Sequence, residues 1–443
     1  MRAANEVVSS ARVPYEVLRA ARTESPQALA WIMLLYIVVT VGRLENLSPS
    51  LMSLHLAKIV AAIAILVALR NKDTLAPTRV RSLVPAQLMF ALMALATLSI
   101  FFSVLKSGTL GVIEGTVISV AVGTVLIVKS ARSWADTRVL LLSFVASAIV
   151  LGVMAMRTSD NGRAGHISAY DPNDFAFVLV TLLPVIVTFA ITSHGLRRLA
   201  YLGVAAWVIL TVLKTESRGG LLGLLVVALV MAILLPSNRR GRLETSPTVG
   251  RTLRRLLLMA VVGALVWSVL PHRAQTRLST ITSLSQDYNA NVSAGGRLTI
   301  WVDTLPLIFH RPWGYGAGAF TTVDGLFGGG RYRAPHNMFL QALIELGVEG
   351  LVLFIAILVS SIRLLARALP KTGPPAPNAR DEIERVAFIR ALIAAFIGAC
   401  VSGFFLSELY SQILWILIAL ACVVTRPLTS SQAPPVVSAS VRN

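Results

Sequence analysis

Apolar residues are grouped along this chain into long blocks, and short polar or basic segments separate one block from the next. Each block is about 20 residues long, which is the length that an α-helix needs to cross about 30 Å of hydrocarbon. A chain that crosses a bilayer must pair its own backbone polar groups, and a helix does this within one segment. The pattern therefore predicts an all-α protein that crosses a membrane many times.

Twelve blocks meet this description, and we expect about twelve transmembrane helices. Their predicted boundaries are 28–42, 51–69, 82–103, 109–129, 138–156, 174–192, 199–213, 219–235, 253–270, 337–366, 386–406 and 410–425. The chain is thereby divided into a tail (1–27), nine helices (28–270), one long loop (271–336), three more helices (337–425) and a second tail (426–443). Because residues 1–27 are polar and basic and no cleavage pattern follows the first apolar block, we expect no cleavable signal peptide.

The composition agrees with a membrane protein and argues against a soluble one. Of the 443 residues, 55% are hydrophobic and 14% are charged, and the mean hydropathy is +0.74. Soluble domains carry about 25% charged residues. The two cysteines both fall inside apolar blocks, so they predict neither a disulfide framework nor a zinc site.

The net charge of +19 indicates membrane topology rather than nucleic-acid binding. Loops on the cytoplasmic side of a membrane carry an excess of Lys and Arg. With the N-terminus in the cytoplasm, 27 of the 40 basic residues lie inside. This orientation predicts that the loop 271–336 is periplasmic and that both tails are cytoplasmic.

Some basic residues lie on the outer side of the predicted membrane, where topology alone does not call for them. An anionic ligand explains cations in that position. These residues are Arg157, Arg163, Lys214, Arg218, Arg273, Arg277, Arg297, Arg311, Arg331 and Arg333.

Three outer segments lead directly into the N-terminus of a predicted membrane helix. They are Asp171-Pro-Asn-Asp174, Thr215-Glu-Ser-Arg-Gly-Gly220 and Pro335-His-Asn337. A helix N-terminus exposes unpaired N–H groups and carries a partial positive charge, so it favours bound anions. If the three ends converge, they form a cationic pocket at the membrane surface. The alternative for Asn173 and Ser217 is that they only cap their helices.

Arg218 is a candidate phosphate ligand, because a guanidinium group offers a planar fork of donors. Gly219 and Gly220 follow it and would let a ligand or another backbone approach closely. The alternative is an arginine that reaches the membrane surface without binding anything.

Arg297 opens a second candidate phosphate site, again behind two glycines. The residues that follow predict an amphipathic helix whose apolar face contains Leu298, Trp301, Leu305 and Ile308. The alternative is a surface arginine on a helix that lies on the membrane, with Trp301 as an interface anchor.

A glycine-rich and aromatic stretch follows, Pro312-Trp-Gly-Tyr-Gly-Ala-Gly-Ala-Phe320, and then Gly328-Gly-Gly-Arg-Tyr-Arg333. Aromatic residues between glycine hinges suit a loop or lid that binds sugar. A plain connection between helices is the alternative. The glycine spacing is not a dinucleotide site, because no parallel βαβ unit surrounds it.

His336 is the candidate general base, because a neutral imidazole accepts protons near neutral pH. The positive end of the following helix and nearby arginines should lower its pKa and keep it unprotonated. Its alternative is a structural histidine at the interface. No pair of histidines has the spacing of metal ligands, so we expect no metal.

A few ionisable residues fall inside the predicted spans: His55, Lys58, Glu114, Glu345 and Glu349. Charges within a membrane are usually paired or face a cavity. Glu345 lies nine residues beyond His336, about 13 Å along a helix, which is too far for direct proton exchange. We interpret it as a structural partner or as part of a lipid groove.

Several of these segments resemble a known family. His336-Asn-Met-Phe-Leu-Gln-Ala-Leu-Ile-Glu-Leu-Gly-Val-Glu-Gly350 is similar to the hallmark segment of the O-antigen ligase and polymerase superfamily. Ser217-Arg-Gly219, Gly296-Arg297 to Trp301 and Pro312-Trp-Gly-Tyr-Gly316 occur in the same order as in that family. The resemblance covers roughly residues 170–360.

The resemblance implies a GT-C-like membrane enzyme that transfers a glycan from undecaprenyl pyrophosphate, with inversion and without a metal or other cofactor. It implies that Arg218 and Arg297 hold the pyrophosphate and that His336 activates the acceptor hydroxyl. Arg157 and Arg163 are further pyrophosphate candidates. The supporting candidates are Asn337, Asp174, Asn173 and Trp301.

The expected acceptor is a sugar hydroxyl of the lipid A core, which would make the protein an O-antigen ligase of the bacterial inner membrane with a periplasmic site. An O-antigen polymerase and a protein O-oligosaccharyltransferase of the same superfamily remain alternatives. A flippase or transporter of lipid-linked glycan is the alternative of another class. Transporters place charges near the midplane of the bilayer, whereas these motifs cluster at one face.

Overall fold

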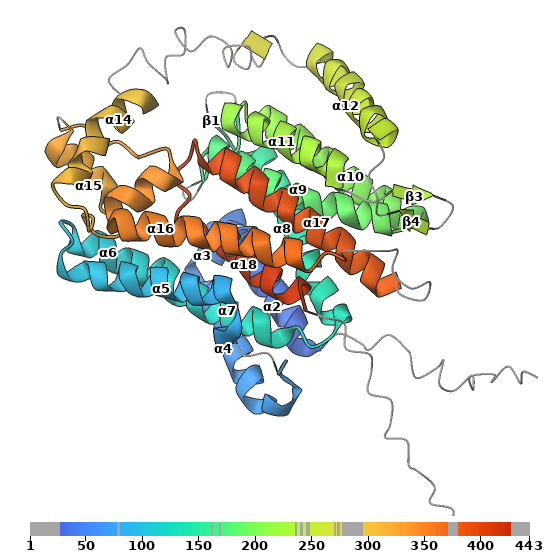
Figure 1. Cartoon of the computed structure of the whole chain (residues 1–443), viewed down its shortest axis with the longest axis horizontal. Coiled ribbons are helices and arrows are strands. Elements are labelled where there is room, and N and C mark those ends of the chain that lie inside the picture. The colour runs from blue at the N-terminus through green and yellow to red at the C-terminus, as the bar shows by residue number, and fades with distance from the viewer. Residues whose placement is uncertain are drawn as a thin grey trace, which may run out of the picture.

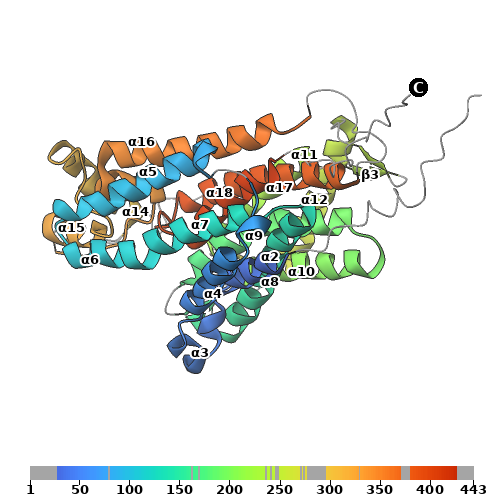
Figure 2. The same cartoon turned by 90° about the horizontal axis from the view of Figure 1, so that it is seen from below.

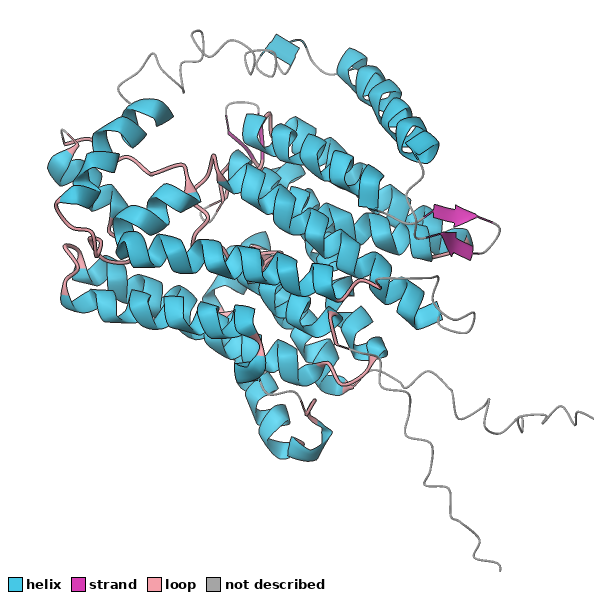
Figure 3. Cartoon of the chain, in the orientation of Figure 1, coloured by secondary structure: helices cyan, strands magenta, loops and turns pink. Residues whose placement is uncertain are grey.

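The computed structural model describes residues 27–77, 80–160, 163–167, 170–234, 237–239, 242–244, 249–269, 272, 275–276, 296–328, 330–370 and 380–426. Helices dominate these residues, as Figure 3 shows, and the prediction of an all-α membrane protein is confirmed. Two short antiparallel hairpins accompany the helices: β1 (Ser159–Asp160) with β2 (Arg163–Ala164), and β3 (Ser237–Arg239) with β4 (Arg242–Glu244).

Each of the twelve predicted spans overlaps a helix. The helices are α2 (Ala28–Thr40), α4 (Leu56–Arg70), α5 (Val84–Leu98), α6 (Lys106–Val112) continuing through a π-helical turn (Ile113–Val117) into α7 (Ile118–Ser130), α8 (Trp134–Arg157), α9 (Pro172–Thr192), α10 (Gly195–Lys214), α11 (Arg218–Leu234), α12 (Val249–Val269), α16 (Met338–Arg367), α17 (Arg380–Gly403) and α18 (Gln412–Val424). Among the described residues, seven helices are long and apolar enough to cross a membrane, and α2, α11 and α18 are shorter apolar helices. The number of crossings stays a prediction.

The second predicted span, 51–69, is interrupted at His55. This residue has a left-handed backbone (φ 47°) between α3 (Pro49–Ser53) and α4, and its side chain is exposed. A left-handed residue cannot continue an α-helix. The helix predicted over 51–69 is therefore divided into α3 and α4 at His55.

The centre of the bundle is α9, whose side chains are almost all buried. It packs against α8, α10, α11 and α17. On the other side, α2 packs on α4 and α8, while α16 packs on α5 and α17 (Figures 1 and 2). Through these contacts, helices from distant parts of the sequence lie side by side.

A smaller assembly covers the start of α16 and lies at the opposite end of the molecule from β3 and β4 (Figure 1). We call it the α14–α15 assembly: α14 (Arg297–Thr304), a 3₁₀ turn (Leu305–Phe309), the glycine-rich turn 312–319 and α15 (Phe320–Phe327). Its own apolar cluster includes Ile300, Tyr315, Phe320 and, from α16, Leu340 and Ile344. Short helices in the loop before α16 were predicted.

Candidate active site

His336 lies immediately before α16 and is held there by its backbone. Its N–H donates to Ser407 Oγ at 3.0 Å, and its φ of 44° is left-handed. Asn337 is the N-cap, since its Oδ1 accepts from the N–H groups of Phe339 and Leu340 at 2.9 and 3.0 Å. A left-handed non-glycine residue is strained, and such strain often marks a functional site.

The start of α9 is closed by a reciprocal capping box. Asp171 accepts from the N–H groups of Asn173 and Asp174 at 2.6 and 3.0 Å, and Asp174 accepts from Asp171 N–H at 2.9 Å. Asp171 is thus the cap, and the alternative that Asn173 only caps this helix does not hold. The side-chain oxygen of Asn173 instead accepts from Arg163 Nη2 at 3.0 Å.

The start of α11 is capped by Ser217, whose Oγ accepts from Gly220 N–H at 3.1 Å. Arg163 Nε donates to the carbonyl of Thr215 at 2.8 Å, so Arg163 ties this turn to the start of α9. A Cβ on Gly220 would lie 2.4 Å from Cβ of Ala176 in α9. This glycine therefore serves helix packing. Arg218 is the first residue of α11 and is half-buried.

The start of α14 carries Arg297. Burial lowers the pKa of this guanidinium, and the carboxylate of Asp171 opposes that change. Trp301, one turn further, donates from Nε1 to the carbonyl of Pro335 at 2.9 Å and lies edge-to-face with Phe404. The helix thus leans against the segment that leads to His336.

The predicted apolar face is packed against the protein only in part. In α14 and the 3₁₀ turn after it Ile300, Thr304 and Ile308 are buried, whereas Leu298 and Leu305 are exposed. A helix beside a membrane has apolar residues both against the protein and toward the surroundings, so periodicity alone does not identify the packed face.

His336, Arg297 and Asp171 come together at one end of the bundle. Burial lowers the pKa of the His336 imidazole, the charge of Arg297 lowers it further, and Asp171 raises it in part. The start of α9, the start of α14 and the start of α16 therefore share one electrostatic site, and Arg163 links it to α11. This convergence was predicted for α9, α11 and α16.

Other residues of the predicted basic set lie elsewhere. Arg157 ends α8 with an exposed side chain, and no described contact joins it to His336. Arg311 lies over the ring of Tyr315, 5.3 Å from its centroid. Arg273 and Arg277 lie outside the described residues.

The sequence interpretation missed Arg43 and Glu408. The guanidinium of Arg43, at the end of α2, lies 4.8 Å from the centroid of the buried Tyr170 ring. Glu408 is buried and shares a hydrogen bond with Asp174; burial and the charge of Asp174 raise its pKa well above the ordinary value. Arg43 and Glu408 thus contact Tyr170 and Asp174, the residues on either side of the turn that begins with Asp171, and stabilise it. An acidic residue between apolar spans was the available signal for Glu408.

Glu216 is a third residue that the sequence interpretation left out. It is left-handed (φ 52°) and 7% exposed, and within the described part of the chain its Oε2 atom has no hydrogen-bond partner. A buried, unpaired carboxylate oxygen costs stability.

The glycine-rich turn is packed firmly against α16. At Gly347 (φ 75°, ψ −171°) α16 departs from helical geometry, and the carbonyls of Ile344 and Glu345 accept instead from Tyr315 and Gly316 N–H at 3.0 and 2.8 Å. A Cβ on Gly347 would lie 2.4 Å from the carbonyl oxygen of Pro312. The glycine-rich turn and α16 thus pack closely through their glycines, and we call this contact the interlock.

Glu345 completes this interlock. It is 1% exposed and accepts from the N–H groups of Gly318 and Phe320 at 2.7 and 3.4 Å and from Tyr410 Oη at 2.7 Å. The structural interpretation of Glu345 agrees with these contacts. The lid interpretation of 312–320 does not, because residues 314–320 are mostly buried and hydrogen-bonded at several points, although Pro312 and Trp313 are exposed.

The fold and the site describe a multi-pass membrane protein whose polar residues gather at one end of its helices. Residues 203–355 match the family model described as O-antigen ligase, and this region includes Arg218, Arg297 and His336. No curated protein matches the chain in sequence. The match over residues 203–355 supports the resemblance to the O-antigen ligase and polymerase superfamily that the motifs indicated.

Proposed function

We propose that this protein is an O-antigen ligase that transfers a glycan from undecaprenyl pyrophosphate to a sugar hydroxyl of the lipid A core. The observation that supports it most is geometric: Trp301 of α14, the helix that begins with Arg297, donates to the carbonyl of Pro335, and the next residue, His336, is held by Ser407. Burial lowers the pKa of the His336 imidazole, and the charge of Arg297 lowers it further. A neutral base beside a desolvated cation suits a reaction that removes a proton from one substrate and releases an anion from another.

In this mechanism the acceptor oxygen attacks the anomeric carbon of the lipid-linked glycan while His336 takes the hydroxyl proton. The bond from that carbon to the pyrophosphate breaks, and the pyrophosphate leaves with the electron pair. Arg218 and Arg297 stabilise the charge that develops on the leaving group. Arg163 already donates to Thr215 and Asn173, so we assign it chiefly to holding the turns.

We propose that the reaction needs no metal. Asp171 and Asp174 are the nearest acidic pair, and their oxygens accept the N–H groups of the capping box. Activity should therefore persist in EDTA. Strong inhibition that a divalent ion reverses would make these carboxylates metal ligands.

The decisive experiment is transfer in detergent or liposomes, with labelled lipid-linked glycan as donor. Core lipid, free lipid-linked glycan and a protein acceptor are offered separately, and the product is identified by mass. Labelled core lipid is the expected product. A lengthened lipid-linked glycan would indicate a polymerase, and a labelled protein would indicate an oligosaccharyltransferase. Movement of intact donor across liposomes without transfer would favour a flippase.

We further propose that the site faces the periplasm from the bacterial inner membrane. Lys214 is the last residue of α10, at the end of the bundle that contains the candidate site. Asp73 follows α4, and α4 runs away from that end of the bundle. Both side chains are exposed. In a variant without Cys400 and Cys422, an impermeant thiol reagent should label Lys214→Cys and not Asp73→Cys in intact spheroplasts. The reverse result would contradict this orientation.

A further inference from the structure

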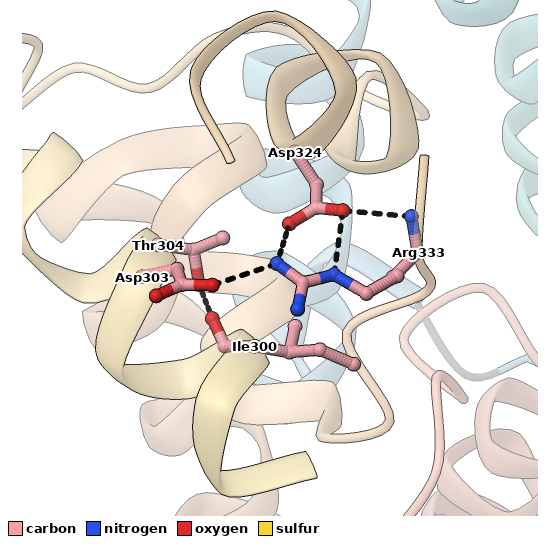
Figure 4. Close-up of polar contacts among 5 residues, drawn as sticks. All are labelled: Ile300, Asp303, Thr304, Asp324 and Arg333. Carbon is pink, nitrogen blue, oxygen red and sulfur yellow. Dashed lines mark hydrogen bonds and ion pairs between the residues drawn. The ribbon is translucent and has the colours of Figure 1, made fainter. Parts of the chain in front are cut away.

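Arg333 is surrounded by carboxylates rather than open to a ligand (Figure 4). Its Nε and Nη2 donate to the two oxygens of Asp324 at 3.0 and 2.7 Å, and Nη2 also donates to Asp303 at 2.9 Å. Its backbone N–H donates to Asp324 at 2.8 Å. The Asp324 side chain is fully buried and that of Arg333 is 9% exposed, whereas Asp303 is at the rim.

The three residues belong to different elements. Asp324 lies in α15, Asp303 in α14, and Arg333 in the segment that reaches His336 three residues later. One guanidinium group therefore joins three pieces of chain. A lysine could not do this, because the forked guanidinium binds both oxygens of one carboxylate and leaves a further N–H for the second.

A second contact joins the same two pieces of chain. Trp301 of α14 donates to the carbonyl of Pro335, the residue before His336. The helix that begins with Arg297 is thus fastened to the segment that ends with His336 at two points, one at Trp301 and one at Asp303.

We propose that Arg333 is a positioning residue, which fixes the separation between Arg297 and His336 by bridging Asp303 and Asp324 and which itself contacts no substrate. The proposal rests on the proposed function, in which these two residues act on opposite sides of the bond that breaks. A displacement of about 1 Å in such an arrangement can lower a rate by about 100-fold.

The sharpest test is Asp303→Asn, which weakens the link to α14 and leaves the buried pair of Arg333 and Asp324 intact. Arg333→Lys keeps the charge and removes the fork. The exposed Arg331→Lys, two residues away, is the matched control. We expect Asp303→Asn and Arg333→Lys to lower kcat by about 10- to 100-fold. Asp303→Asn should leave the thermal midpoint of the protein nearly unchanged, and the control should behave as the wild type.

A second measurement does not depend on activity. The pKa of His336 is read by NMR of protein labelled in its histidines, with His336→Ala to assign the signal. Among the described residues, Arg297 and Asp171 are the charged groups that act on His336. When α14 is released, the charge of Arg297 moves away, so the pKa of His336 should rise in both variants and not in the control.

The two readouts separate the proposals. An unchanged His336 pKa in Asp303→Asn and Arg333→Lys would overturn the positioning role. A raised pKa with undiminished transfer would support the link between the two segments and overturn the proposed catalytic role of His336. A loss of kcat that merely follows the loss of folded protein, with no change in the pKa, would reduce Arg333 to a stabilising residue.

Discussion

Arg333 and Arg297 belong to the same small assembly but have opposite surroundings. Hydrogen bonds to Asp324 and Asp303 raise the pKa of Arg333 above its ordinary value, whereas burial lowers the pKa of Arg297. Within the described part of the chain, no ion pair joins Arg297 to a carboxylate. An arginine already neutralised by carboxylates stabilises the fold, and one that is desolvated without such a partner favours an anion from outside.

The largest effect that this comparison predicts is at His336, whose pKa is lowered by burial and by the charge of Arg297. His336→Ala should lose about 10²–10⁴-fold in single-turnover rate, which is the usual contribution of a positioned base. Donor affinity should change little, because in the proposed mechanism His336 acts on the acceptor hydroxyl and not on the donor. The exposed His310→Ala is the control. Undiminished turnover in His336→Ala would leave leaving-group stabilisation as the main catalytic effect.

Replacement by alanine should affect Arg297 and Arg333 differently: donor binding is weakened at Arg297, and the fold is destabilised at Arg333. In the proposed mechanism Arg297→Ala removes a charge-assisted contact to the pyrophosphate worth about 1.5–3 kcal/mol, so donor affinity should fall about 10- to 100-fold while the protein stays folded. Arg218→Ala should behave similarly. Lysine should restore either site only in part.

Arg333→Ala should instead destabilise the fold by about 3–5 kcal/mol, because Asp324 is left buried without its partner. The measurements are donor binding and thermal unfolding of each variant. If Arg297→Ala unfolds while Arg333→Ala loses donor affinity, the assignment of the two arginines is reversed.

The smallest predicted effect is on pH dependence. A base must be unprotonated, so kcat/KM for the donor should fall as the pH drops through the pKa of His336, which lies below its ordinary value of 6.5. A bound pyrophosphate offsets the charge of Arg297, so the acid limb of kcat should lie at higher pH than that of kcat/KM. Arg297→Ala should move the acid limb of kcat/KM to higher pH, because it removes a charge that lowers the pKa of His336. A limb that is unchanged in this variant would separate Arg297 from His336.

Much of the fold could be predicted from the sequence, because hydrophobic blocks long enough to cross a bilayer have few alternatives to a helix. Local chemistry also identified Ser217 as a cap, whereas the capping role of Asn337 was not predicted. The cap of α9 was missed although the sequence contains the signal: Pro172 is suited to the first helical position, which makes Asp171 the cap and not Asn173.

The rest depended on contacts between distant segments. Arg297 and Arg333 look alike in the sequence, and only the packing of α15 against the loop brings Asp324 to one of them. Arg43 and Glu408 support the turn of Asp171 from opposite ends of the chain, far from any motif. The glycines of 312–318 suggested mobility, but in the structure they permit close packing on α16.

The interlock between Gly347 and the turn at Pro312 also limits how this protein can be recombined with its relatives. A chimera that exchanged only 312–318, or only the first turns of α16, would pair a glycine on one side with a foreign backbone on the other. Since a Cβ at Gly314 would lie 2.5 Å from the carbonyl oxygen of Glu345, such a mismatch leaves no room. Crossover points for exchanging glycan preference therefore belong before Pro312 and after Gly347, so that both halves of the interlock are inherited as one unit.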